Sequence, residues 1–189
     1  MTITQPSTTA TSTDERSDLL AMLADQREQF RITVRGIDEE QARLRTTASE
    51  LTLGGLLRHV ANTERHWVQV IHDRDENAAM DMASLGNEYL IGDDQTVDGL
   101  LAEWDSIVAA TEALVRSDRS LDELIPLPTA PWAPEREWWS VRRILLHVFR
   151  EIAQHSGHAD IIRETLDGQN STYARAGIDQ ATVDGWFAG

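Results

Sequence analysis

The chain has 189 residues, 26% of them charged, and a formal net charge of −15 at pH 7. This length suits one domain with a single core. The acidic balance opposes a phosphate-binding surface, so we expect neither nucleic acid nor an anionic membrane as a partner. The sequence lacks both cysteine and lysine, which excludes disulfides, thiolate metal ligands, cysteine nucleophiles and lysine Schiff bases. Any bound metal must therefore be held by His, Asp or Glu.

The chain ends differ from the middle in composition. Residues 1–13 have no basic start and no apolar run, so we expect a disordered tail and not a signal peptide or anchor. No apolar stretch is long enough for a transmembrane helix, so we expect a soluble protein, and the lack of an export signal favours the cytoplasm. Residues 14–168 are expected to form one domain. Residues 169–189 are expected to form a mostly irregular tail that packs on the domain or extends from it.

The first two helices are predicted from apolar residues spaced three or four apart. One begins at Asp14 and ends before Gly36, and a short connecting helix follows over 38–45. The second long helix begins after an N-cap, Ser49 or Thr52, and continues to about residue 72.

Two glycines near the start of that helix require an explanation. Gly54 and Gly55 each cost a helix up to about 1 kcal/mol relative to alanine. Either the helix begins after them, or the backbone of another segment packs closely against them. The polar segment 73–95 is long for a helix connection, which suggests a crossover along the bundle or a loop over a site.

Two further helices complete the prediction. Thr96 caps a third helix that runs to about Arg116, and Ser140 caps a fourth, with Ile161 on its buried face, that stops at Gly168. The prolines between them are expected to exclude regular structure over 126–135. The fold class predicted is all-α, a four-helix bundle with a long crossover connection.

All six histidines fall on the second and fourth helices: His59, His66 and His72 on one, and His147, His155 and His158 on the other. At about 100° per residue, the three histidines of the fourth helix share one stripe with Glu151, beside the apolar face. Glu151 and His155 are one turn apart, a spacing that lets two side chains reach one ion. His155 and His158 are the alternative pair. Helical bundles commonly build metal sites from such inward side chains.

A third ligand has to come from another helix. His59 is the best candidate because its neighbours Leu56, Leu57 and Val60 are apolar. His72 lies at the helix end, where we expect it to be solvated. His66 is about 10.5 Å further along than His59 and points nearly the same way, so it could line the same cleft without sharing the ion.

Each of these residues also has an ordinary explanation, in which every histidine is a separate surface or hydrogen-bonded core residue. Trp138 and Trp139 are expected to pack against helices and not to form a substrate cage. Several charged residues are expected to lie on a solvated face: Arg58, Glu64, Arg65, Arg150, Arg163 and Glu164.

Four segments together resemble a known family. LTLGGLLRHVANTERHWVQVI and WWSVRRILLHVFREIAQHSGHADIIRETLDG resemble the two signature helices of the DinB-like superfamily. With DERSDLLAMLADQREQF and GDDQTVDGLLAEW, the closer resemblance is to its actinobacterial, mycothiol S-transferase-like branch, a domain of unknown function. The resemblance covers about residues 14–168, with the motifs in the expected order. It implies a DinB-like four-helix bundle, for which homodimerisation is plausible.

The resemblance also implies a divalent metal bound by His59, Glu151 and His155. Many DinB-like proteins carry histidine where this chain has Glu151, and the His-Glu-His set resembles that of mycothiol-dependent maleylpyruvate isomerases. Two imidazoles and one carboxylate with an open position suit zinc, with nickel, iron and manganese as alternatives.

The function implied is that of a metal-dependent thiol S-transferase or isomerase. A low-molecular-weight thiol, mycothiol or bacillithiol, would be the co-substrate and would attack a small electrophile as a metal-activated thiolate. His158 and His66 are candidates for proton transfer or for support of a ligand. The alternatives are a non-catalytic metal- or small-ligand-binding bundle, and a helical interaction module without metal.

Overall fold

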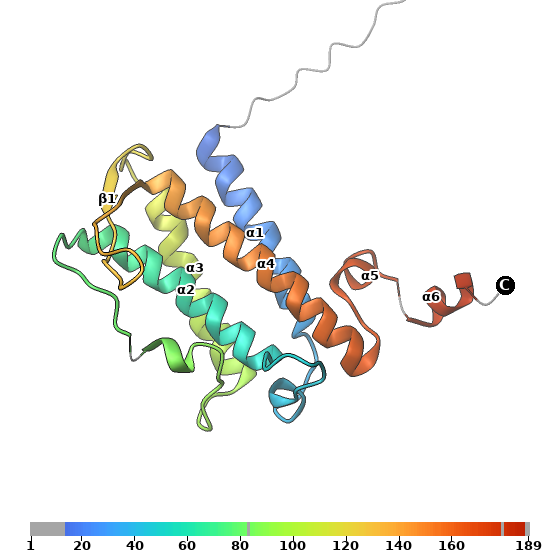
Figure 1. The fold of residues 1–189 in the computed structure, drawn as a ribbon. Helices are drawn as coiled ribbons and strands as arrows, with labels where there is room; N and C mark the ends of the chain where they lie inside the picture. Colours follow the sequence, from blue (N-terminus) through green and yellow to red (C-terminus); the bar gives the residue numbers. More distant parts are fainter. Residues whose placement is uncertain (1–13, 83, 179, 188–189) are drawn as a thin grey trace, which may run out of the picture.

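Four long helices form the molecule in a computed structural model that describes residues 14–82, 84–178 and 180–187. They are α1 (Glu15–Thr33), α2 (Leu53–Asp73), α3 (Val97–Arg116) and α4 (Val141–Asp167). Helix α1 packs on α4, and α2 packs on both α3 and α4 (Figure 1). The predicted all-α four-helix bundle is therefore confirmed. The predicted tail over 1–13 lies outside the described residues.

The helix ends follow the capping residues. Thr52, Thr96 and Ser140 each accept a hydrogen bond from the backbone N–H three residues later, so Thr52 is the cap of α2. Gly168 ends α4 in the left-handed conformation, with φ of 78°. Ile161, predicted from its spacing to be buried, is exposed. Among the described residues, no helix has both the length and the apolar character that a membrane crossing requires.

A short hairpin precedes α4, where the prolines were expected to exclude regular structure. Strand β1 (Leu124–Pro126) pairs antiparallel with β2 (Trp138–Ser140), so that expectation is wrong at this point. Pro126 ends its strand, and the N–H of the next residue, Leu127, donates to the carbonyl of Glu137. The pairing thus needs no donor from proline. Trp138, expected to pack against a helix, is exposed on this hairpin.

The connecting segments also differ from the prediction. The connecting helix after α1 is one 3-10 turn, η1 (Gln41–Arg43), and the α2–α3 connection contains another, η2 (Ser84–Asn87). The segment after α4 is not mostly irregular, since it contains α5 (Ser171–Arg175) and α6 (Gln180–Phe187). Helix α5 packs on α1.

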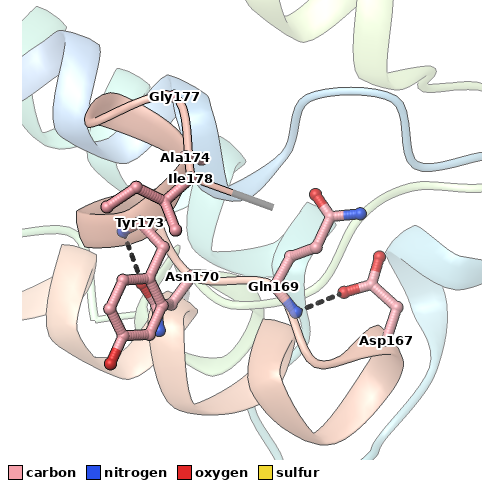
Figure 2. Close-up of a pocket in the computed structure, with 7 residues that line it drawn as sticks. All are labelled: Asp167, Gln169, Asn170, Tyr173, Ala174, Gly177 and Ile178. Atoms are coloured by element: carbon pink, nitrogen blue, oxygen red, sulfur yellow. Dashed lines mark hydrogen bonds between the residues drawn. The ribbon is translucent and has the colours of Figure 1, made fainter. Parts of the chain in front are cut away.

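The turn from α4 into α5 forms a pocket of about 360 Å³ (Figure 2). Its lining has no histidine, and its one carboxylate, Asp167, is paired with Arg163 at 2.9 Å. This pocket therefore lies apart from the residues that could hold a metal.

The two glycines of α2 lie within its first turn, where other backbone segments approach closely. A Cβ on Gly55 would lie 2.0 Å from the carbonyl oxygen of Tyr89, and one on Gly54 would lie 2.9 Å from that of Ala42. The second of the two explanations for the glycines is therefore the right one. The α2–α3 connection returns over the start of α2.

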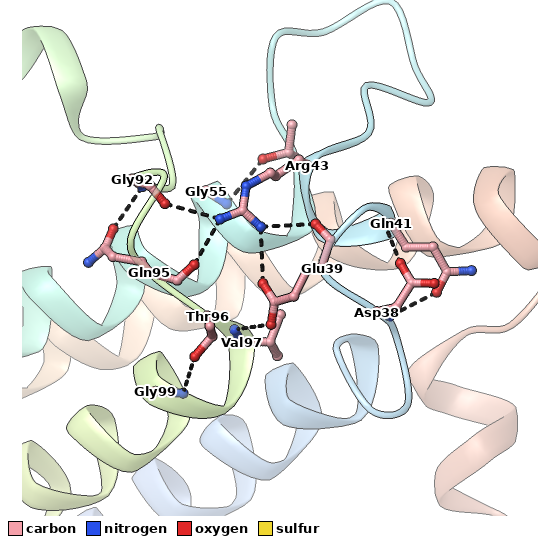
Figure 3. A network of polar contacts seen from close by, with 11 residues as sticks. Asp38, Glu39, Gln41, Arg43, Gly55, Gly92, Gln95, Thr96, Val97 and Gly99 are labelled. Carbon is pink, nitrogen blue, oxygen red and sulfur yellow. Dashed lines mark hydrogen bonds and ion pairs between the residues drawn. The ribbon is translucent and has the colours of Figure 1, made fainter.

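A polar network fixes the end of that connection (Figure 3). The guanidinium of Arg43 donates to the carbonyls of Gly92 and Gln95 at 3.0 and 2.8 Å. It also pairs with Glu39, whose carboxylate accepts the N–H of Val97 at 2.9 Å. The α1–α2 connector is thereby tied to the beginning of α3.

A buried carboxylate lies on the opposite face of α2. Glu64 is fully buried and accepts hydrogen bonds from Arg27 at 3.2 Å, Trp104 at 2.9 Å and Thr111 at 2.5 Å. The expectation that Glu64 lies on a solvated face is wrong, because its face of α2 is covered by α3 and by the Arg27 side chain of α1. Arg163, expected to be solvated as well, is also buried.

Gly55→Ala should destabilise the protein by about 1–3 kcal/mol, because the new methyl group overlaps the Tyr89 carbonyl. The control is Gly157→Ala in α4, where a Cβ meets nothing within 4 Å. That change should stabilise the protein by up to about 1 kcal/mol, since alanine is the better helix former. Urea denaturation followed by circular dichroism measures both. Equal changes in stability for Gly55→Ala and Gly157→Ala would contradict the close approach of the Tyr89 carbonyl to Gly55.

Glu64→Ala should cost about 3–5 kcal/mol of unfolding free energy, since it leaves the buried Arg27 guanidinium without its counter-ion. The control is Glu112→Ala, which removes an exposed pair with Arg116 and should change stability by less than about 0.5 kcal/mol. The same urea titration applies. If Glu64→Ala lowers the free energy of unfolding as little as the control does, the buried network does not stabilise the protein.

Candidate metal centre

Three side chains converge where α2 faces α4. His59 on α2 and His155 on α4 are buried, and Glu151 on α4 is partly buried. One possible ligand atom from each lies within 4.8 Å of the other two, and His155 Nε2 is 3.8 Å from Glu151 Oε2. Donors in a tetrahedral zinc site are about 3.4 Å apart. Small side-chain adjustments would therefore suffice to bind one ion.

The charge states of the three donors also suit a divalent cation. Burial, as the main cause, and the proximity of His155 together lower the pKa of His59 to about 4, although Glu151 opposes the shift. Burial likewise lowers the pKa of His155. Both imidazoles are thus neutral at pH 7 and can donate a lone pair, while Glu151 supplies a negative charge. The residues fit a catalytic type of zinc site with an open position.

His158 does not join this group of donors. Its Nδ1 lies 3.2 Å from Nδ1 of His155, on the far side of that imidazole from the Nε2 that faces Glu151. This contact can fix the ring orientation and tautomer of His155. The structure thus places His158 behind a candidate ligand.

Glu151 has its own contacts along α4. Arg150 donates to its carboxylate at 3.2 Å, and Nδ1 of His147 lies 3.7 Å from it. The ring of His147 packs edge-on against Trp67 and Trp139, which stack with their centroids 5.7 Å apart. Trp139 is thus a packing residue, as predicted.

Two residues of the α2–α3 connection reach the same place, and sequence reasoning missed both. The ring of Tyr89 stacks on His59 with centroids 4.2 Å apart, and Oε2 of Glu88 lies 3.9 Å from His59 Nδ1. Burial raises the pKa of the Glu88 carboxyl, against the opposing charge of Arg58, and burial also raises the pKa of the Tyr89 phenol. The length of segment 73–95 had suggested a crossover or a loop over a site, but it did not identify Glu88 or Tyr89.

A cleft of about 650 Å³ opens beside His59. Helix α2 forms one wall, and Ala79, Met80, Asp81 and Glu88 of the connection contribute to the other. His66 lines this cleft, whereas His72 is exposed and lies outside it. The full lining is Arg58, His59, Asn62, Thr63, Arg65, His66, Trp67, Gln69, Ala79, Met80, Asp81 and Glu88.

Comparison with known proteins assigns the chain to a family. The family model for mycothiol-S-transferase matches residues 18–168, which include all four bundle helices except the first residues of α1. The chain belongs to the mycothiol-S-transferase family. This membership confirms the resemblance seen in the sequence. A search of curated proteins found no match.

Two solved structures share the fold of this mycothiol-S-transferase family member. A conserved protein from Enterococcus faecalis is 14% identical with a TM-score of 0.63, and the match covers 84% of this chain and all of that one. YfiT from Bacillus subtilis is 15% identical with a TM-score of 0.57, over 89% of this chain and 93% of its own. YfiT is described as a probable metal-dependent hydrolase with an unusual four-helix bundle topology.

The depressed pKa of His59 predicts how the stability of the metal-free protein depends on pH. Below its ordinary pKa of 6.5, the unfolded chain takes up a proton that the folded protein does not bind until about pH 4. The free energy of unfolding should therefore fall by up to about 3 kcal/mol as the pH decreases from 6.5 to 4. Urea titrations with a chelator present measure this, and His59→Gln should flatten the slope. If His59→Gln keeps the pH dependence of the wild type, the lowered pKa of His59 is contradicted.

Proposed function

We propose that this member of the mycothiol-S-transferase family is a metal-dependent thiol S-transferase or isomerase. Its substrates would be a low-molecular-weight thiol, mycothiol or a similar compound, and a small electrophile. The observation that carries the proposal is the His59, Glu151 and His155 donor set, which lies beside a cleft in a chain of this family.

A divalent metal held by these three residues would lower the pKa of a thiol bound at its open position, so that a thiolate is available near neutral pH. The protein has no cysteine, so the sulfur must come from a separate molecule. The arrangement of α2 and α4 holds the donors, and the bundle interior excludes water from their buried side.

The cleft supplies groups that can bind and orient the two substrates. Arg58, Asn62 and Gln69 offer hydrogen bonds to a polar thiol carrier, while Trp67 and Met80 offer apolar surface. This mixture suits a small polar thiol that reacts with an apolar electrophile.

Two histidines complete the proposal. His66 lines the cleft and is proposed to accept the thiol proton and pass it to solvent. His158 contacts His155 and is proposed to hold its orientation.

Replacing any one of the three ligands by alanine should weaken zinc binding by more than about 100-fold, since each supplies one of only three protein donors. His72→Ala should leave binding unchanged. His158→Ala should retain the metal but lower thiol transfer by about 10- to 100-fold. Zinc content after dialysis and the loss of mycothiol thiol groups with a panel of electrophiles measure these effects.

The same measurements separate the alternatives. If His158→Ala empties the site and Glu151→Ala does not, the α4 ligands are His155 and His158. Stoichiometric zinc without thiol consumption would favour a non-catalytic metal-binding bundle. Hydrolysis that needs no thiol would favour the metal-dependent hydrolase that YfiT is described to be. Full zinc occupancy in every variant would place the ion elsewhere.

A further inference from the structure

Residues 87–90 of the α2–α3 connection are held firmly against α2. The guanidinium of Arg58 donates to the carbonyls of Asn87 and Leu90. Between these two contacts, the carbonyl of Tyr89 lies so close to Gly55 that no side chain would fit there. The backbone on both sides of Glu88 is thus fixed by its contacts with the helix that carries His59.

This attachment determines what surrounds the imidazole of His59. The Tyr89 ring covers one face of the imidazole at a centroid distance of 4.2 Å. The Glu88 carboxylate lies at its edge, 3.9 Å from Nδ1. Glu88 and His59 both line the cleft.

The three candidate ligands are then supported in the same way. His155 directs Nε2 to Glu151 and Nδ1 to His158, and Glu151 is contacted by Arg150. The corresponding group for His59 is Glu88. A metal-binding imidazole generally donates its second N–H to a carboxylate, carbonyl or water, and this contact sets its tautomer.

We propose that Glu88 is a positioning residue that accepts the Nδ1 proton of His59 and thereby directs Nε2 of that imidazole toward the metal. This inference rests on the proposed function, because it needs His59 as a ligand. The distance of 3.9 Å is about 1 Å longer than a hydrogen bond. The Glu88 side chain is 38% exposed and extends from a fixed backbone, so a change of its χ angles can close that gap.

A competing contact exists for the other nitrogen. The hydroxyl of Thr63 lies 3.5 Å from Nε2 of His59. That distance is too long for a strong hydrogen bond, and a hydroxyl can either donate or accept. A carboxylate can only accept a hydrogen bond, so Glu88 favours the His59 tautomer with a protonated Nδ1. Thr63 fits either tautomer.

Glu88→Ala should weaken zinc affinity by about 10- to 100-fold, and Glu88→Gln by less, because its amide oxygen can still accept. The control is Glu76→Gln, an exposed carboxylate in the same connection, which should leave the affinity unchanged. Competition with a chromophoric zinc chelator measures affinity. Circular dichroism verifies that each variant is folded.

The second readout is the tautomer of His59, from long-range ¹⁵N–¹H correlation spectra of the zinc-loaded protein, with His59→Gln identifying its signals. The wild type should show a protonated Nδ1 and a zinc-bound Nε2, and Glu88→Ala should show a mixture. The inference is overturned if Glu88→Ala keeps the wild-type affinity and tautomer, or if zinc binds Nδ1. In both cases the proposed function stands. A wild type that binds none of zinc, nickel, iron and manganese overturns both.

Discussion

Burial of polar groups on two faces of α2 is the constraint on which the rest of this structure depends. His59 faces α4, and Glu64, five residues later, faces α1 and α3. At about 100° per residue these side chains point in well-separated directions, so no rotation of α2 can improve one environment without removing the other. An unpaired buried charge costs several kcal/mol, which makes the Glu64 network a strong determinant of the helix orientation. The position of His59 relative to α4 follows from that orientation.

Helical periodicity accounts for what could be predicted from the sequence. The caps Thr96 and Ser140 and the stop at Gly168 follow local rules that the structure confirms. The convergence of His59 with Glu151 and His155 required only that apolar faces meet inside a bundle. Glu64 was predictable in principle, because it lies four residues after the buried Val60. The prediction placed Glu64 on the surface because it is charged. A carboxylate that accepts hydrogen bonds from three side chains can nevertheless be buried.

The rest depends on contacts between segments distant in the chain. Glu88 and Tyr89 lie in a connection without periodicity, and nothing in their own neighbourhood indicates that they reach His59. The hairpin before α4 was missed for a similar reason. Pro126 can end an edge strand, but its own neighbourhood does not reveal that Trp138–Ser140 is the partner strand. Gly54 and Gly55 indicated a close approach, but the sequence could not identify the segment that approaches.

The candidate metal centre thus draws on three parts of the chain: α2, α4 and the α2–α3 connection. A metal bound only by the folded arrangement would stabilise all three together, in proportion to the logarithm of its concentration over its dissociation constant. Without metal, the pairing of α2 with α4 at this point brings two neutral imidazoles and a carboxylate into a partly dry contact, which contributes little to stability. The bundle therefore relies on its apolar core and on the Glu64 network for folding.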